Sequence, residues 1–342
     1  MKGRENFLDL LVTRDDWLAQ LDEPVVDPER EIVDPHHHLW HRGGSLYELD
    51  ALWADTGSGH RIAETVFVQC HAYHDKDAAP HLRPVGETRA VAAMAAASEA
   101  SPDQATIAGI VAHADLRLPP EQLDEVLSAH EAAADGRFRG IRHSASFEKH
   151  AEAFLIAGRG PAGLYLDPDY IRGAQRLGER GLTMDAWHYH HQNEEFLRLV
   201  RACPGTTMIL DHFGGPMGVG PYAGLRETRF SDWQRDMEAI ATCPNVVAKL
   251  GGLAMPDNGF GWHERATPPT SDELVSANLH YYRHMIDVFG AERCMFESNF
   301  PVDRVSISYR ILWNAFKKIA GDLPENSKSD LFAGTARRIY RL

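Results

Sequence analysis

The sequence lacks the features that mark several classes of protein. Its 342 residues carry 49 acidic and 35 basic side chains, a formal net charge of −14, and show no basic stripe, which argues against a nucleic-acid partner. No apolar run approaches the roughly 18 residues of a membrane span, and the N-terminal stretch has no signal-peptide core. Four cysteines without a CxxC spacing argue against a disulfide framework or a cysteine zinc site. We therefore predict a cytoplasmic protein.

Two catalytic motifs are missing as well. No G-x-G-x-x-G follows the first predicted strand, which argues against an open dinucleotide-binding sheet. No G-x-S-x-G occurs, so a serine nucleophile of the α/β-hydrolase type is not expected.

Short β-branched runs alternate with amphipathic stretches along most of the chain, and the latter open on Pro, Asp-Pro or Ser, which are helix-start signals. The predicted strands span residues 30–36, 64–70, 105–113, 137–144, 182–189, 206–212, 245–252 and 293–299. Eight strand–helix units in one chain predict an α/β fold, a (β/α)8 TIM barrel over residues 30–342. Residues 1–29 are predicted to form a short N-terminal extension with one short helix.

Histidines gather where these strands end, and six of the eight predicted ends carry one. Barrel active sites lie at the carboxyl ends of the strands. In the stretch D-P-H-H-H-L-W, alternation places His36 and His38 on one face and His37 on the other. An H-x-H pair on one strand can bind one cation through both imidazoles, and zinc is a suitable cation.

Several stretches together resemble a known family. They are D-P-H-H-H-L-W with Asp34, FRGIRHS (138–144), LDHFGGP (210–216), NVVAKLGGL (245–253), CMFESNFPVD (294–303) and the closing LFAGTARRIYRL. The chain resembles the amidohydrolase superfamily, and within it the amidohydrolase-2 branch, which contains lactonases acting on sugar and dicarboxylate lactones and aromatic-acid decarboxylases. The resemblance runs from near residue 30 to the C-terminus.

The resemblance implies that His36 and His38 are metal ligands or, in metal-free members, substrate-binding histidines. It also implies a histidine after the fifth strand, for which we choose His190, with His188 as the second choice because both share one face. The implied cofactor is one divalent metal, zinc or manganese, and a metal-free mechanism stays open.

For the catalytic groups, the resemblance assigns His212 to orienting water or polarising the carbonyl. Asn299 stands where metal-dependent members carry an aspartate, and an amide cannot act as a general base near neutral pH. Glu297, two residues deeper on the same face, or Asp303 in the following loop would have to substitute. The alternative roles are a buried partner of a cation for Glu297 and a helix cap for Asp303.

Three further side chains are predicted to bind substrate, namely Arg142, His71 and Lys249. Arg142 and Lys249 supply positive charge that suits a carboxylate or a hydroxylated lactone, although Lys249 could simply pair with a neighbouring acid. The long loops 39–63 and 253–270 are expected to form walls of the pocket.

The leading functional prediction is a hydrolase that opens a lactone or related cyclic ester by attack of water on the carbonyl. One alternative is a metal-dependent non-oxidative decarboxylase of an aromatic or unsaturated acid, against which Asn299 counts. Another is a barrel that binds a ligand without turnover, which Asn299 favours and the many histidines oppose. The expected partner is a small molecule, a lactone or a carboxylate. A homodimer is compatible with the resemblance, and no sequence feature decides it.

Overall fold

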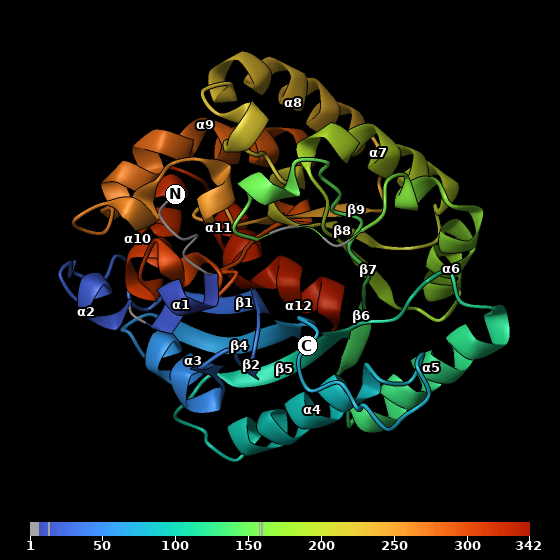
Figure 1. The fold of residues 1–342 in the computed structure, drawn as a ribbon. Helices are drawn as coiled ribbons and strands as arrows, with labels where there is room; N and C mark the ends of the chain where they lie inside the picture. The colour runs from blue at the N-terminus through green and yellow to red at the C-terminus, as the bar shows by residue number, and fades with distance from the viewer. Residues whose placement is uncertain (1–6, 13, 157, 159) are drawn as a thin grey trace.

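The computed structural model describes residues 7–12, 14–156, 158 and 160–342. Eight parallel strands form a nearly closed barrel in the order β1-β4-β5-β6-β7-β8-β9-β10, and helices follow the strands around its outside (Figure 1). The strands are β1 (Glu31–His37), β4 (Arg61–Val68), β5 (Thr106–Ala112), β6 (Phe138–Arg142), β7 (Thr183–Ala186), β8 (Met208–Leu210), β9 (Val246–Leu250) and β10 (Cys294–Phe296). The predicted (β/α)8 barrel is confirmed.

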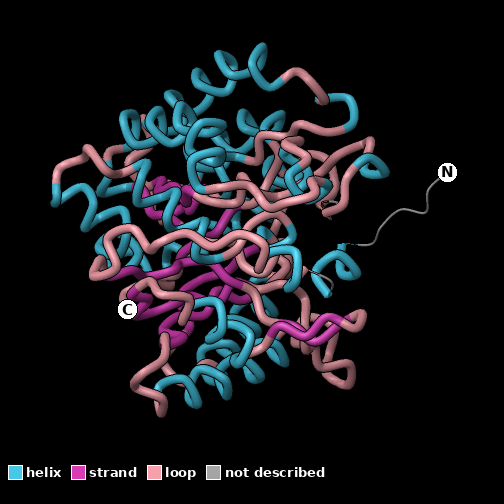
Figure 2. The backbone as a smooth tube through the Cα atoms, turned by 90° about the vertical axis from the view of Figure 1, so that its left-hand side faces the viewer, coloured by secondary structure: helices cyan, strands magenta, loops and turns pink. Residues whose placement is uncertain are grey.

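The helices that pack around the barrel lie above and below the strands in the side view (Figure 2). They are α3 (Leu49–Thr56), α4 (Val85–Glu99), α5 (Pro120–Ala133), α6 (Pro168–Glu179), α7 (Asn193–Ala202), α8 (Arg226–Ala241), α9 (Ser271–Phe289) and α10 (Tyr309–Ile319). Their starts follow local rules: Thr270 and Glu273 form a capping box at α9, and the Ser308 side chain accepts from the Ile311 amide at α10. Across the described ranges, no helix is long and apolar enough to cross a membrane.

The seam between β10 and β1 is held by hydrogen bonds between backbone groups and by hydrogen bonds to the carboxylate of Asp34. The Asn299 amide donates to His36 O at 3.0 Å, and the His38 amide donates to Phe300 O at 2.7 Å. Asp34, fully buried, accepts from the Ser298 amide at 2.9 Å and from the Tyr309 hydroxyl at 3.0 Å. The aspartate of the D-x-H-x-H motif therefore joins the first strand to the last.

Before β1 lie α1 (Phe7–Val12) and α2 (Asp15–Leu18), and after β1 comes a hairpin of β2 (Trp40–Arg42) and β3 (Ser45–Tyr47). Gly43 and Gly44 form its turn with φ of 58° and 78°, the left-handed backbone that a two-residue hairpin turn of this kind requires. A Cβ on Gly43 would lie 2.8 Å from Leu8 Cδ1, so the hairpin packs closely on α1.

One end of the barrel is filled by an apolar floor. Its inward-facing strand residues are Val33, Val66, Val68, Val111, Ile209, Val247 and Met295. Ala336 and Tyr340 of the C-terminal helix α12 (Thr335–Tyr340), which follows α11 (Glu325–Ser329), pack onto these residues. The side chains at this end are apolar and offer no reactive group, so we expect the site at the other end.

Candidate active site

A charged layer lies above the floor on three neighbouring strands. Asp211, Lys249 and Glu297 come two residues after Ile209, Val247 and Met295, so strand alternation points them into the barrel. All three are fully buried. The sequence R-C-M-F-E-S-N thus places an apolar side chain and then a carboxylate on one inward face.

Glu297 holds two histidines at once. Its Oε1 lies 2.6 Å from His212 Nδ1, and its Oε2 lies 2.6 Å from His36 Nδ1. A carboxylate only accepts, so His212 Nδ1 carries the proton and His212 Nε2 keeps a lone pair. The Arg142 guanidinium only donates and lies 3.2 Å from His36 Nε2, so that nitrogen also keeps a lone pair. Histidines that bind metals usually donate their other ring nitrogen to a carboxylate in this way. Glu297 therefore orients His212 by a hydrogen bond, and it lies against the His36 ring together with Lys249 Nζ, which is 3.3 Å from His36 Nδ1.

Charge and burial act differently on these two rings. Burial, together with the nearby Lys249 ammonium, lowers the pKa of His36 well below its usual range. Burial also opposes protonation of His212, but the charge and hydrogen bond of Glu297 outweigh it and raise the pKa of His212. A ligand that needs a neutral His212 Nε2 must displace a proton.

Two glycines after β9 leave room for this pair. A Cβ on Gly252 would lie 2.6 Å from His212 Nδ1, and a Cβ on Gly251 would lie 2.3 Å from the Glu297 Cγ. Any larger side chain at either position would collide with the site, which explains the K-L-G-G stretch.

Asp211 is the unsatisfied member of the cluster. Neither carboxylate oxygen has a hydrogen-bond partner within the described ranges, and the nearest cations are Lys249 Nζ at 3.6 Å and Arg142 Nη1 at 3.8 Å. A buried carboxylate without hydrogen bonds is costly unless something else binds it. Ligand atoms of His36, Asp211 and His212 all lie within 4.8 Å of one another. Two imidazoles and a carboxylate suit a divalent metal such as zinc, so these residues fit one.

Lys249 does not reach the cavity, contrary to the predicted substrate contact. Its ammonium is fully buried and donates to Asp185 Oδ2 at 2.7 Å. Burial opposes its charge, but Asp185, Asp211 and Glu297 outweigh burial and raise the pKa of Lys249. Lys249 sits below the site as the counter-ion of two carboxylates.

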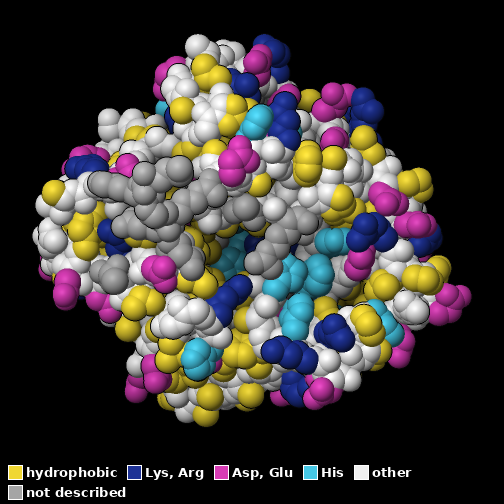
Figure 3. Space-filling model, viewed as in Figure 1, with side chains coloured by type: hydrophobic (Ala, Val, Ile, Leu, Met, Phe, Trp, Pro, Cys, Tyr) yellow, Lys and Arg dark blue, Asp and Glu magenta, His cyan; other side chains and the backbone are white. Residues whose placement is uncertain are grey.

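A cavity of about 480 Å3 opens above the cluster. Its wall includes the predicted residues His38, His71, Arg142, His212 and Asn299, together with Gln69, Ser144, Trp40, Arg42 and Trp187. Apolar side chains of Phe7, Leu8, Leu155, Ile156, Met255 and Val302 complete it. Figure 3 shows histidines gathered beside the hollow at the centre of this face. Both long loops, 39–63 and 253–270, contribute to the wall.

His38 and His37 take opposite sides of β1. The His38 Nδ1 lies 2.7 Å from Val68 O, so Nδ1 carries the proton and Nε2 keeps a lone pair. Burial and then the Arg142 charge lower the pKa of His38 well below its usual range. The His37 ring packs 6.1 Å from Phe67, away from the cavity.

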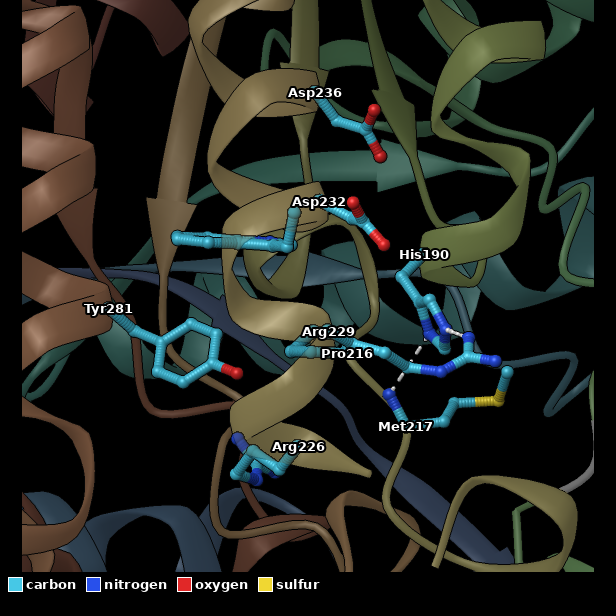
Figure 4. Close-up of a pocket in the computed structure, with 9 residues that line it drawn as sticks. His190, Pro216, Met217, Arg226, Arg229, Asp232, Asp236 and Tyr281 are labelled. Carbon is cyan, nitrogen blue, oxygen red and sulfur yellow. Dashed lines mark hydrogen bonds between the residues drawn. The ribbon is translucent and has the colours of Figure 1, made fainter. Parts of the chain in front are cut away.

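His190 lies apart from His36 and His38, so the predicted set of three ligands is not brought together. Its Nε2 is 2.8 Å from Arg229 Nη1 and its Nδ1 is 3.3 Å from the Met217 amide. It lines a separate pocket of about 60 Å3 beside α8, into which Arg229 and Met217 also point (Figure 4).

The reason lies in the alternation at the end of β7. Asp185 and Trp187 point inward, so His188 points outward, where it bonds Asn193 of α7 at 3.0 Å. His190 begins a short 3-10 helix (His190–Gln192) beyond β7, so the strand alternation assumed for it does not apply there.

Asn299 and Asp303 form a pair at the edge of the cavity. The Asn299 Nδ2 donates to Asp303 Oδ1 at 3.1 Å, and the Ala254 amide donates to Asp303 Oδ2 at 3.2 Å. Burial raises the pKa of Asp303 to about 7, although His212 opposes this rise. Asp303 does not cap α10, because Ser308 does.

Two carboxylates central to the cluster, Asp211 and Asp185, were not singled out from the sequence. Each is a lone charge at the end of an apolar strand, T-T-M-I-L-D and L-T-M-D-A. A charge in a run that is otherwise buried is the signal that could have found them.

Comparison with known proteins identifies the family to which the chain belongs. The family model described as Amidohydrolase matches residues 33–342. The chain belongs to this family. This amidohydrolase is 32% identical over 325 residues to the uncharacterized protein y4mH of Sinorhizobium fredii, with 91% of this chain and 98% of that protein covered. It is 25% identical to an L-fucono-1,5-lactonase of Burkholderia multivorans, with 91% and 96% covered. An amidohydrolase from Burkholderia multivorans, solved with bound Zn, superposes with a TM-score of 0.72 at 23% identity over 92% of this chain and all of that one.

Proposed function

We propose that this amidohydrolase opens a lactone by attack of water on its carbonyl carbon. The observation that carries the proposal is Asp211, a buried carboxylate without a hydrogen-bond partner among the described residues, beside His36 and His212, whose Nε2 atoms keep a lone pair. The cluster lies at the base of a cavity large enough for a small ring compound. The relative named L-fucono-1,5-lactonase supports this reaction class.

His36, His212 and Asp211 would hold one divalent metal. When bound, such a cation polarises a carbonyl oxygen and lowers the pKa of water. Zinc or manganese suits the donor set. For His36 Nε2 to serve, the Arg142 guanidinium, now 3.2 Å from it, has to turn toward the substrate.

The remaining side chains divide the reaction among them. The Asn299 amide is fixed by Asp303, so its oxygen is available to orient water. The His38 Nε2, the unprotonated ring nitrogen, takes the proton of the attacking water as the oxygen bonds to the carbonyl carbon. Arg142 stabilises the developing oxyanion. The ring C–O bond then breaks, and the proton returns from His38 to the leaving oxygen, which yields a hydroxy acid.

The test combines metal analysis with a lactone panel. The purified chain, incubated with zinc or manganese, should bind near one equivalent by plasma mass spectrometry and release acid from five- or six-membered lactones. Asp211→Asn and His212→Asn should each lower kcat/KM by about 100- to 1000-fold. His37→Phe, a substitution on the same motif that faces away, should leave kcat/KM within about threefold.

Release of carbon dioxide from an aromatic acid, without any lactone hydrolysis, would replace the proposal with decarboxylation. Binding of lactones without turnover, even with metal supplied, would leave a ligand-binding barrel.

A further inference from the structure

Arg42 enters the cavity from outside the barrel strands. It ends β2, just before the Gly43–Gly44 turn, and lines the cavity together with Trp40. Its Nη2 donates to Cys70 O at 2.8 Å, and its guanidinium lies 4.9 Å from the centre of the Trp40 ring. The hairpin and these two contacts fix the guanidinium in place.

No counter-ion among the described residues neutralises this arginine. None of their carboxylate oxygens lies within 4 Å of it, and its buried Nε has no hydrogen-bond partner among them. The carboxylate that faces it at longer range is Glu87, whose Oε1 accepts from the Ala72 amide at 2.6 Å and the Cys70 amide at 3.2 Å. Arg304, in contrast, pairs with Asp15 at 2.8 Å and Asp55 at 3.4 Å.

Arg42 and Arg142 are anchored on neighbouring carbonyls at the end of β4. Arg142 donates to Gln69 O and Arg42 donates to Cys70 O, so two guanidinium groups line one cavity. Arg142 has the Asp211 carboxylate at 3.8 Å, whereas no described carboxylate oxygen forms an ion pair with Arg42. A guanidinium offers paired donors that match a carboxylate. The cavity wall beside it is largely apolar, which strengthens such a contact by excluding water.

We infer that Arg42 determines specificity by binding a carboxylate substituent of the substrate, remote from the carbonyl that is attacked. The substrate class is then a lactone bearing a carboxylate, in preference to a neutral lactone. This inference rests on the proposed lactone hydrolysis and adds the chemistry of the substituent.

The test compares two lactones with the same ring, 5-oxotetrahydrofuran-2-carboxylate and its carboxamide. The wild-type protein should have a kcat/KM about 10- to 100-fold higher for the carboxylate. Arg42→Gln should abolish that preference through KM, with kcat for either compound changed less than threefold. Arg42→Lys should retain part of it, because the charge remains without the planar donors. His41→Gln, on the exposed face of the same strand, is the matched control and should keep the full preference.

A binding measurement separates this inference from the proposed reaction. Calorimetry with glutarate should show binding to the wild-type protein that weakens at least tenfold in Arg42→Gln. If neither lactone is hydrolysed but this loss is seen, lactone hydrolysis fails and the carboxylate site stands. If the wild-type protein hydrolyses both lactones equally and glutarate binds Arg42→Gln as tightly as the wild-type protein, the inference is overturned while hydrolysis stands. If Arg42→Gln does not fold, Arg42→Lys decides the question: an undiminished preference for the carboxylate and undiminished glutarate binding in that variant overturn the inference.

Discussion

Two layers of the barrel interior are built by the same strands and have opposite chemistry. The floor carries apolar residues, among them Ile209, Val247 and Met295. The next inward positions on the same strands carry Asp211, Lys249 and Glu297. One step of two residues therefore changes a packed core into a reactive cluster.

The difference shows how the fold supports its site. Each fully buried apolar side chain of the floor contributes roughly 1.5–3 kcal/mol to folding. Buried charges contribute little or nothing net, and they become strongly destabilising when one partner is lost. The floor stabilises the barrel, and the charged layer depends on complete pairing.

The largest effect is expected from breaking the pairing in the charged layer. Lys249→Met removes the cation that lies between Asp185 and Asp211, so two buried carboxylates lose their counter-ion. We expect a loss of about 3–5 kcal/mol in the free energy of unfolding, measured by urea titration. Lys318→Met, at an exposed ion pair with Asp272, should change it by less than about 1 kcal/mol. An equally small effect at Lys249 would contradict the contrast between the layers.

A smaller effect is expected where the two layers meet. The Tyr340 hydroxyl, from the floor, donates to Asp185 Oδ2 at 2.8 Å. Tyr340→Phe should lower stability by about 1–2 kcal/mol, because a buried carboxylate loses a donor. Tyr165→Phe is the matched control: that buried hydroxyl has no hydrogen-bond partner among the described residues, so its loss should be neutral or stabilising. An equal loss of stability in both variants would show that the hydrogen bond between Tyr340 and Asp185 does not stabilise the fold.

The smallest effect should come from a buried titratable group outside both layers. Burial lowers the pKa of His130, on α5, to about 4. The unfolded state therefore binds more protons between about pH 4 and 6.5, and the stability contributed by neutral His130 is complete above pH 6.5 and lost as pH falls.

His130→Gln should flatten the pH dependence of stability between pH 7 and 5 by on the order of 1 kcal/mol, seen in unfolding curves at each pH. Activity at pH 7 should not change. If the substitution also changed the pH profile of kcat/KM, the protonation of His130 would be coupled to the charged layer.

Elements set by local patterning could be predicted from the sequence. The eight barrel strands follow from short apolar runs, many of them rich in β-branched residues, and the shared side of His36 and His38 follows from the two-residue period of a strand. The same reasoning could not say which parity of the W-H-Y-H-H stretch faces inward. It therefore chose His190, where the structure places Trp187 in the cavity and His188 against α7.

Other features depend on contacts between distant segments. Lys249 was expected at the cavity, but only the fold reveals the buried Asp185 that holds it. The same holds for Glu297, since the two histidines beside it, His212 and His36, lie 85 and more than 250 residues away in sequence. Arg42 lies in a stretch that reads as a loop, and its hairpin is needed to bring it to the wall.

The closure of the barrel has a consequence for how quickly this chain can fold. Arg337 of α12 forms an ion pair with Glu31 on the first strand, across 306 positions of sequence, and Tyr340 completes the floor beneath β7. To form contacts of such long sequence separation, the chain must first lose the entropy of closing a long loop, and only then does it gain the stabilising contacts. The floor is therefore expected to form late, and β1 cannot gain its full protection from hydrogen exchange until α12 has docked.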